Sequence, residues 1–169
     1  MSPVARRLSL LVVLPALILS ACLIVGPDFS RRAGAPNGTT WILQEVLLSG
    51  VVVDARSLDP PANLTFGTAE RTASRDRQET GAVEGYSGCN DLNARYMLEE
   101  ESAGSGTLQF TEVTHTERAC DGLQGQVDGL VLMGVRHADR FEIRDGVLRI
   151  GVAPDAPAPA LTMEFVEAE

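Results

Sequence analysis

The stretch Phe141-Glu142-Ile143-Arg144-Asp145-Gly146-Val147-Leu148-Arg149-Ile150 decides the fold class of this chain. Apolar and polar residues alternate on both sides of Asp145-Gly146, which is the period of a strand with one buried face. An Asp-Gly pair between two alternating runs is a strong signal for a two-residue hairpin turn. The stretch therefore predicts two antiparallel strands, at residues 141–143 and 147–150.

The segment before this hairpin has the period of a helix. The positions that share one helical face are Leu123, Val127, Leu130, Val131, Gly134 and Val135. Asp121 is a suitable N-cap for this helix. Gly125, Gly129 and Gly134 each cost up to about 1 kcal/mol relative to alanine. We therefore expect the helix to depend on packing against a sheet.

The rest of the chain from Thr40 onward alternates short apolar segments with turn signals. The further strands that we expect are residues 41–46, 51–53, 63–66, 82–86, 95–98, 107–110 and 161–165. An antiparallel sheet curled against one helix would bury both apolar sets. The prediction is an α+β, mainly β fold, either a curled antiparallel sheet or a partly open barrel of about eight strands packed with one helix.

Three segments are predicted to be loops or turns. Residues 67–80 hold six charged side chains and almost no apolar residue, so we expect an exposed loop, with a binding loop as the alternative. Residues 154–159 are rich in proline. The run Glu99-Glu100-Glu101 is predicted to be a solvated turn rather than a pair of catalytic carboxylates, because adjacent residues cannot face each other across a cleft.

The N-terminus is typical of an exported protein. Residues 1–7 end in Arg6-Arg7, and residues 8–19 are nearly all apolar. Twelve residues are too few to span a bilayer, which needs roughly 20, but they fit the core of a signal peptide. We expect residues 1–21 to be a lipoprotein signal peptide, because they end in Leu19-Ser20-Ala21 before Cys22 and this box resembles the bacterial lipobox. An ordinary secreted protein cleaved nearby and an uncleaved anchor are the alternatives.

Lipidation of Cys22 would fix the protein to a membrane. The resemblance to a lipobox implies two or three acyl chains, which together give stable anchoring. Residues 22–39 show no regular period and are predicted to be a flexible tether, followed by one domain at residues 40–169. Neither residue 23 nor residue 24 is acidic, so in a Gram-negative cell we expect the outer membrane, with the domain facing the periplasm.

The charge of the chain excludes several partners. All 14 basic residues are arginine, and the formal net charge of the whole chain is −9. Removing the signal peptide, which carries Arg6 and Arg7 and no acid, leaves −11. A strongly acidic domain is unsuited to nucleic acid, because phosphate binding needs clustered cations. The acidity is compatible with a basic partner in the envelope.

Cys89 and Cys120 remain once Cys22 carries lipid. An even pair in an oxidising compartment favours a disulfide, which would pin the turn at Cys89 to the segment before the helix. Two buried free thiols, a reactive pair and a zinc site with His115 and His137 are the alternatives. We predict no bound metal and no cofactor.

The order of these features resembles the META domain family, which includes heat-inducible bacterial envelope lipoproteins. The resemblance covers residues 40–166 and depends most on Gly88-Cys89-Asn90. The residues that match the family motif are Trp41, Gly88, Asn90, Asn93, Tyr96 and Thr116. Gly88 and Asn90 both tolerate left-handed backbone angles, which favours a tight turn, with a ligand cradle as the alternative. The chain departs from the family at the longer charged segment 67–80, at the glycines of the helix and at Ala94.

The resemblance implies a compact domain without a known catalytic centre. No Ser-His-Asp order or nucleophile elbow is present, so the sequence also predicts no enzyme. Family members are associated with heat stress and with antibiotic tolerance of the novobiocin type. We expect a non-catalytic, membrane-anchored lipoprotein that binds another, unknown envelope protein. The alternative is a periplasmic inhibitor of a lytic enzyme or protease that uses residues 67–80 as its inserting loop.

Overall fold

The structure is a computed structural model, and it describes residues 35–71, 78–152 and 159–169. The predicted signal peptide, the lipidation site Cys22, the tether up to residue 34 and most of the proline-rich loop lie outside the described residues. These predictions are therefore neither supported nor contradicted by the fold.

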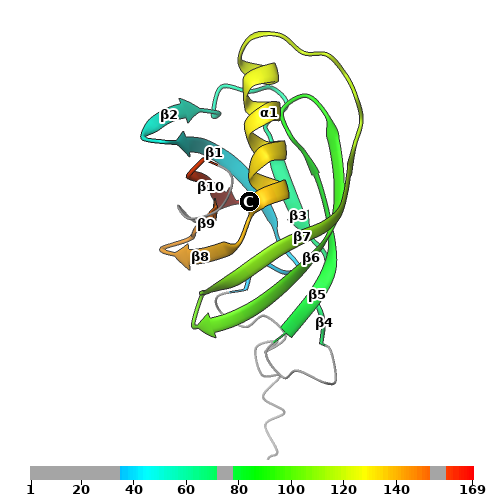
Figure 1. Cartoon of the computed structure of the whole chain (residues 1–169), viewed down its shortest axis with the longest axis vertical. Coiled ribbons are helices and arrows are strands. Elements are labelled where there is room, and N and C mark those ends of the chain that lie inside the picture. The colour runs from blue at the N-terminus through cyan, green and yellow to red at the C-terminus, as the bar shows by residue number, and fades with distance from the viewer. Residues whose placement is uncertain (1–34, 72–77, 153–158) are drawn as a thin grey trace, which may run out of the picture.

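The described residues form ten strands and one helix (Figure 1). The strands are β1 (Thr40–Leu48), β2 (Val51–Asp54), β3 (Asn63–Phe66), β4 (Glu70–Arg71), β5 (Gln78–Tyr86), β6 (Asp91–Ser102), β7 (Ser105–His115), β8 (Arg140–Arg144), β9 (Val147–Val152) and β10 (Leu161–Glu167). The helix is α1 (Gly122–His137). The chain is thus mainly β, as predicted.

The sheet closes into a barrel. The strand order is β10-β9-β8-β7-β6-β5-β3-β1, and β1 pairs again with β10, so eight antiparallel strands form a closed ring. The predicted curled sheet or partly open barrel is confirmed in its architecture, and the β1–β10 pairing adds the closure. Strand β2 pairs with the second half of β1, and β4 pairs with the start of β5, so both lie outside the ring.

Alternating side chains fill the barrel. Trp41 and Leu43 on β1, Leu148 and Ile150 on β9, and Phe165 on β10 are all buried. The Asp145-Gly146 turn has positive φ at both residues, and so has Ser49-Gly50 between β1 and β2. Both are the turns that match the twist of paired strands. The hairpins that the alternating pattern predicts are therefore confirmed.

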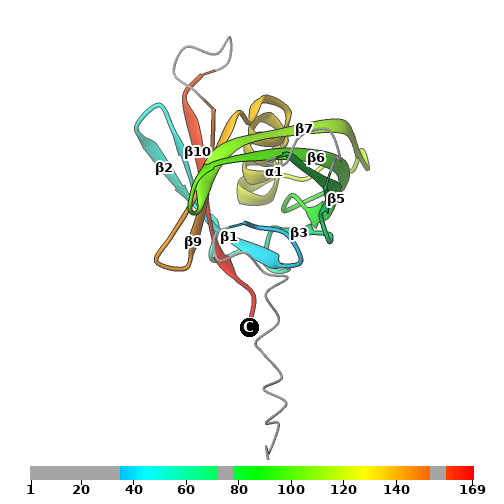
Figure 2. The same cartoon turned by 90° about the horizontal axis from the view of Figure 1, so that it is seen from below.

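Helix α1 lies within the outline of the strands in Figure 2, where it is seen almost end-on, and it contacts β7, β9, β10 and β1. Asp121 is the N-cap residue, but its side chain makes no capping hydrogen bond. Val127, Val131 and Val135 are buried, as the helical period predicts. Gly134 lies so close to β10 that an added Cβ would be 2.6 Å from Cε of Met163. An alanine here would therefore force the buried Met163 side chain to shift.

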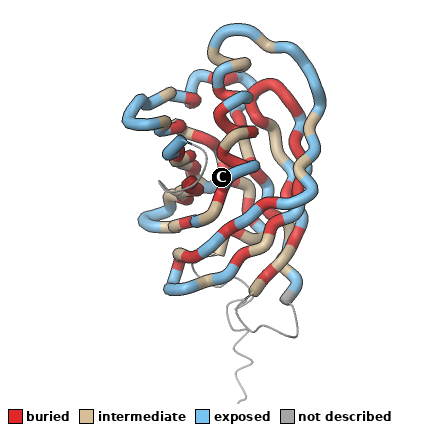
Figure 3. The backbone as a smooth tube through the Cα atoms, viewed as in Figure 1, coloured by how far each residue is buried: buried red, intermediate tan, exposed pale blue. Residues whose placement is uncertain are grey.

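Two loop predictions were wrong. Within residues 67–80, Glu70–Arg71 and the first residues of β5 are strands that pair with each other. Residues 72–77 lie outside the described residues. The Glu99-Glu100-Glu101 run belongs to β6, and the turn follows at Ala103-Gly104. The β6–β7 hairpin projects beyond the barrel body (Figure 3). The three glutamates are therefore largely exposed to solvent, and their negative charges do not prevent the formation of β6.

Candidate functional site

A buried polar cluster surrounds the turn between β5 and β6. Gly88 has φ of +102°, which only glycine adopts without strain. Cys89 forms a disulfide with Cys120, with 6.0 Å between their Cα atoms. The predicted disulfide is confirmed, and it ties the turn to the residue two positions before α1. The alternatives of free thiols, a reactive pair and a zinc site do not fit this bonded pair.

The Asn90 side chain joins three segments. Its Oδ1 accepts from Thr116 Oγ1 at 2.9 Å and from the Arg118 backbone N–H at 2.7 Å. Its Nδ2 donates to Asp128 Oδ1 at 3.0 Å and to the Arg118 carbonyl oxygen at 3.3 Å. Asn90 is only 3% exposed. The amide therefore uses its whole bonding capacity inside the fold, which supports the structural role of this turn over a ligand cradle.

Ser87 and Asp128 complete the cluster. The Ser87 hydroxyl is in contact with Asp128 Oδ1, and it accepts from the Asn90 backbone N–H at 3.1 Å. No imidazole contacts either side chain: His115 bonds the Thr116 carbonyl oxygen and Arg136. The contact between Ser87 on the turn and Asp128 on α1 therefore fixes the helix to the turn.

The sequence prediction missed part of this cluster. Asp128 lies on the polar side of the predicted helix, and Ser87 precedes the motif by one residue. A small polar residue just before a Gly-Cys-Asn turn was the available signal for Ser87. Nothing in the spacing of Asp128 indicates that its carboxylate reaches the turn between β5 and β6.

The motif residues Trp41 and Tyr96 lie in the barrel interior, apart from this cluster. The Tyr96 ring stacks edge-on against Phe66 with 5.2 Å between centroids, and its hydroxyl donates to the Gly67 carbonyl oxygen at 3.1 Å. It lies directly opposite Gly81, where an added Cβ would be 2.5 Å from the ring. Burial, and next the charge of Glu79, raise the pKa of Tyr96 to about 12. This tyrosine stays neutral and acts as a core residue.

Residues 35–39 close the base of the barrel. The Trp41 indole Nε1 donates to the Pro36 carbonyl oxygen at 3.1 Å, and Asn37 Nδ2 donates to Glu79 Oε2 at 2.8 Å. Pro36 is buried and Glu79 is 8% exposed. Residues 35–39, which the sequence assigned to the tether, are thus packed against the barrel.

The last motif residue, Asn93, is exposed on β6, where its carbonyl oxygen accepts from Thr114 Oγ1 at 3.4 Å. The structure therefore distributes the six motif residues over three places. Gly88, Asn90 and Thr116 form the polar cluster, Trp41 and Tyr96 lie in the barrel, and Asn93 lies on its surface.

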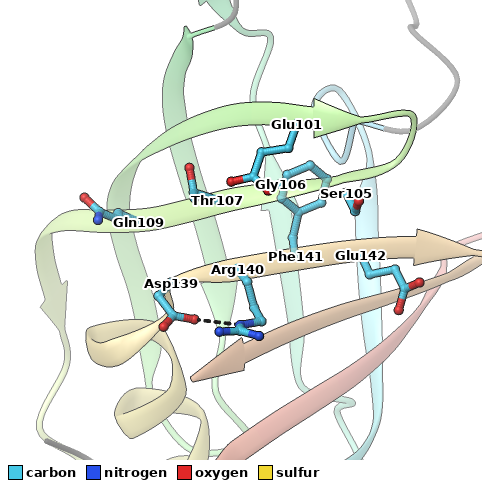
Figure 4. A pocket seen from close by; sticks show the side chains of 9 residues that line it. All are labelled: Glu101, Ser105, Gly106, Thr107, Gln109, Asp139, Arg140, Phe141 and Glu142. Carbon is cyan, nitrogen blue, oxygen red and sulfur yellow. Dashed lines mark hydrogen bonds and ion pairs between the residues drawn. The ribbon is translucent and has the colours of Figure 1, made fainter. Parts of the chain in front are cut away.

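A hollow surface lies where β7 and β8 separate (Figure 4). These strands pair only at Ser105–Thr107 and Arg140–Glu142, and an open hollow of about 570 Å³ lies beside them. Two smaller hollows adjoin it across β8 to β10, and Arg140 lines all three. Arg140 Nε bonds Asp139 Oδ1 at 3.2 Å, drawn as the dashed line in Figure 4.

This outer groove has the chemistry of a binding surface. Its side chains are mixed hydroxyls, amides and charges, with Phe141 buried beneath them. Among the described residues, no group of histidine, cysteine and acidic side chains is arranged to hold a metal ion. The groove therefore offers hydrogen-bonding and charged contacts to a polar partner.

Three comparisons with known proteins describe what this chain resembles. A family model described as "META domain" matches residues 35–161. No curated protein matches the chain. A solved structure, described as the NMR structure of the protein from Burkholderia xenovorans, is similar with a TM-score of 0.52 and 21% identity, over 98% of this chain and 99% of that chain. At this identity the similarity concerns the fold alone. Over the described residues, no helix combines the length and apolar character needed to cross a bilayer.

Proposed function

Because the chain belongs to the META domain family, we propose that it is a non-catalytic envelope lipoprotein, anchored through lipid on Cys22. The observation that carries the proposal is the Leu19-Ser20-Ala21-Cys22 box directly after an apolar run of signal-peptide length. If the cell is Gram-negative, residues 23 and 24 favour the outer membrane, with the barrel in the periplasm.

The disulfide supports export. Disulfides persist in oxidising compartments and are rare in the cytosol. The Cys89–Cys120 bond joins the turn after β5 to the segment before α1, so it is part of the folded domain. Export from the cytosol would account for both the predicted N-terminal signal and this disulfide.

The proposed activity is binding of another envelope component, linked to tolerance of heat or of antibiotics of the novobiocin type. The polar outer groove around Arg140 is a surface suited to such a component. The network at Asn90 is fully bonded within the fold, which favours a scaffold over a reactive centre. The alternative of an enzyme inhibitor would use residues 72–77, which connect β4 and β5 and lie outside the described residues.

The test is a deletion strain grown with heat stress and, separately, with novobiocin. We expect the deletion to be sensitive, the full chain to restore growth, and a Cys22→Ser chain to fail although it is produced and folded. A deletion strain that grows as well as its parent under both stresses would contradict the proposed role.

A further inference from the structure

Arg140 is held in place from two sides. Its Nε atom donates to Asp139 Oδ1 at 3.2 Å. Its aliphatic stem lies over Gly151, the cross-strand partner on β9, where an added Cβ would be 3.3 Å from Cγ of Arg140 and 3.5 Å from Cδ. These contacts restrict the rotamers of a side chain that is 60% exposed. The guanidinium group is therefore positioned before a partner arrives.

The outer edge of this guanidinium group is open. Apart from the contact with Asp139, Arg140 makes no hydrogen bond or ion pair with residues 35–71, 78–152 or 159–169. The terminal nitrogens Nη1 and Nη2 of an arginine form a planar fork that matches the two oxygens of a carboxylate. An arginine that is fixed through Nε and open at both Nη atoms is therefore suited to bind a carboxylate.

The acidic residues of the hollow disfavour a simple anion. Of the described residues that line it, Arg140 is basic, whereas Glu101, Asp139 and Glu142 are acidic. Asp139 bonds Arg140, and Glu142 lies 3.9 Å from Arg144. Glu101 makes no hydrogen bond or ion pair within the part of the chain that the structure describes. A phosphate dianion would meet more negative than positive charge, whereas a ligand with a carboxylate and a cation would match both signs.

The strand order sets the separation of these two charges. Glu101 belongs to β6 and Arg140 to β8, and β7 lies between them. Figure 4 shows Glu101 on the β6 side of β7 and Arg140 on its β8 side. Neighbouring strands are about 4.8 Å apart, so the two backbones are roughly 10 Å apart. A chain end with a basic side chain one residue before its terminal carboxylate covers a distance of this order.

We propose that this hollow binds the C-terminus of a peptide or protein that carries a basic side chain next to its last residue. The terminal carboxylate accepts from Nη1 and Nη2 of Arg140, and the basic side chain pairs with Glu101. Ser105, Thr107 and Gln109 line the hollow and supply hydrogen bonds to the peptide backbone. The inference rests on the proposed function, binding of an envelope component, and it names the part of that component that is recognised.

The test uses the full chain in detergent and a tripeptide of glycine, lysine and alanine, in that order, with a fluorophore on its amino end. A second peptide has a C-terminal amide, and a third has norleucine in place of lysine. Fluorescence anisotropy measures binding, with empty detergent as the blank. We expect the first peptide to bind at least about threefold more tightly than each of the others, because each altered peptide loses one ion pair.

Two variants assign these preferences to residues. Arg140→Gln should remove the preference for the free carboxylate over the amide and keep the preference for lysine over norleucine. Glu101→Gln should do the reverse. Both side chains are exposed, so neither substitution should disturb the fold, which circular dichroism checks. A purely structural role of either residue would change the binding of all three peptides alike.

The matched control is Arg56→Gln. The Arg56 side chain is also 60% exposed and also donates through Nε to a nearby carboxylate, that of Asp54, at 2.9 Å. We expect this variant to keep both preferences.

The proposal is overturned if the wild type binds none of the peptides or binds the free carboxylate and the amide equally. It is also overturned if Arg140→Gln or Glu101→Gln keeps the preference assigned to that residue, or if Arg56→Gln loses one. The assay depends neither on lipid at Cys22 nor on growth under stress, so a deletion strain that tolerates both stresses is a separate outcome.

Discussion

At the residue scale, Tyr96 and Asn90 show why the motif residues are needed. Tyr96 fills the space over Gly81 and bonds a backbone carbonyl oxygen, so it combines packing with satisfaction of a polar group. Asn90 bonds three segments that are distant in sequence. The sequence predicted that these residues matter, and the contacts give the physical reasons.

Replacing Tyr96 by phenylalanine should destabilise the protein by about 1–2 kcal/mol at neutral pH, because the Gly67 carbonyl oxygen loses its donor. The difference in stability between the wild type and Tyr96→Phe should become smaller as the pH rises above 10. The native pKa of Tyr96 is about 12 against an ordinary value of 10. The unfolded wild-type chain therefore releases the proton first, and the wild type loses about 2–3 kcal/mol between pH 10 and pH 12.

Denaturant unfolding of the wild type and Tyr96→Phe at pH 9 and pH 11.5 measures this difference. The variant lacks the Tyr96 proton, so its free energy of unfolding should fall less over this range. An equal fall in both proteins would show that Tyr96 ionises as readily in the native state as in the unfolded chain.

Asn90→Ala should lower the free energy of unfolding by about 2–3 kcal/mol, because the Asn90 side chain is buried and its loss leaves the Arg118 backbone N–H and the Asp128 carboxylate without this partner. The matched control is Asn93→Ala at an exposed motif position, which should change stability by no more than about 0.5 kcal/mol. Urea unfolding followed by Trp41 fluorescence measures both. Similar losses for the two variants would contradict the assigned role of the cluster.

At the scale of elements, the sequence predicted the existence of most strands better than their ends. Alternation identified the β8–β9 hairpin and β10, because each strand has one buried and one exposed face. It shortened β5, because the first buried positions of this strand hold Glu79 and Gly81 and no large apolar residue. It shortened β6 at its end, because residues 99–102 are polar and largely exposed. β4 was missed because it is two residues long, which is too short to show an alternating pattern.

Helix α1 offers a paired test of packing against propensity. Gly134→Ala should destabilise the protein by about 1–2 kcal/mol, because the new Cβ would overlap the buried Met163 side chain. Gly129→Ala should stabilise it by up to about 1 kcal/mol, because no atom lies within 4 Å and alanine favours the helix. Thermal unfolding followed by circular dichroism measures both. Stabilisation by both substitutions would show that α1 does not pack on β10 at Gly134.

The disulfide stabilises the link between the β5–β6 turn and α1. Its cysteines are 31 residues apart, so the bond should contribute about 3–4 kcal/mol by restricting the unfolded chain. Urea unfolding with and without reductant measures this contribution. The Cys89→Ala, Cys120→Ala double variant is the control, and its unfolding should not respond to reductant. If reductant lowers the stability of both proteins equally, the loss of stability does not come from the Cys89–Cys120 disulfide.

At the scale of the whole molecule, the closure of the barrel could not be predicted from the sequence. Leu43 on β1 lies opposite Phe165 on β10, and no local pattern records a pairing over such a separation. The hollow around Arg140 likewise arises only when β7 and β8 separate. In contrast, the N-terminal signal is local, so the sequence carries the prediction of lipidation by itself.

The most direct test of that prediction is the intact mass of the protein extracted from membranes, before and after reduction. The account predicts a chain that begins at Cys22, is heavier than its amino acids by two or three acyl chains, and gains two hydrogen atoms on reduction. A chain that retains residues 1–21, or that begins at an unmodified Cys22, would contradict it.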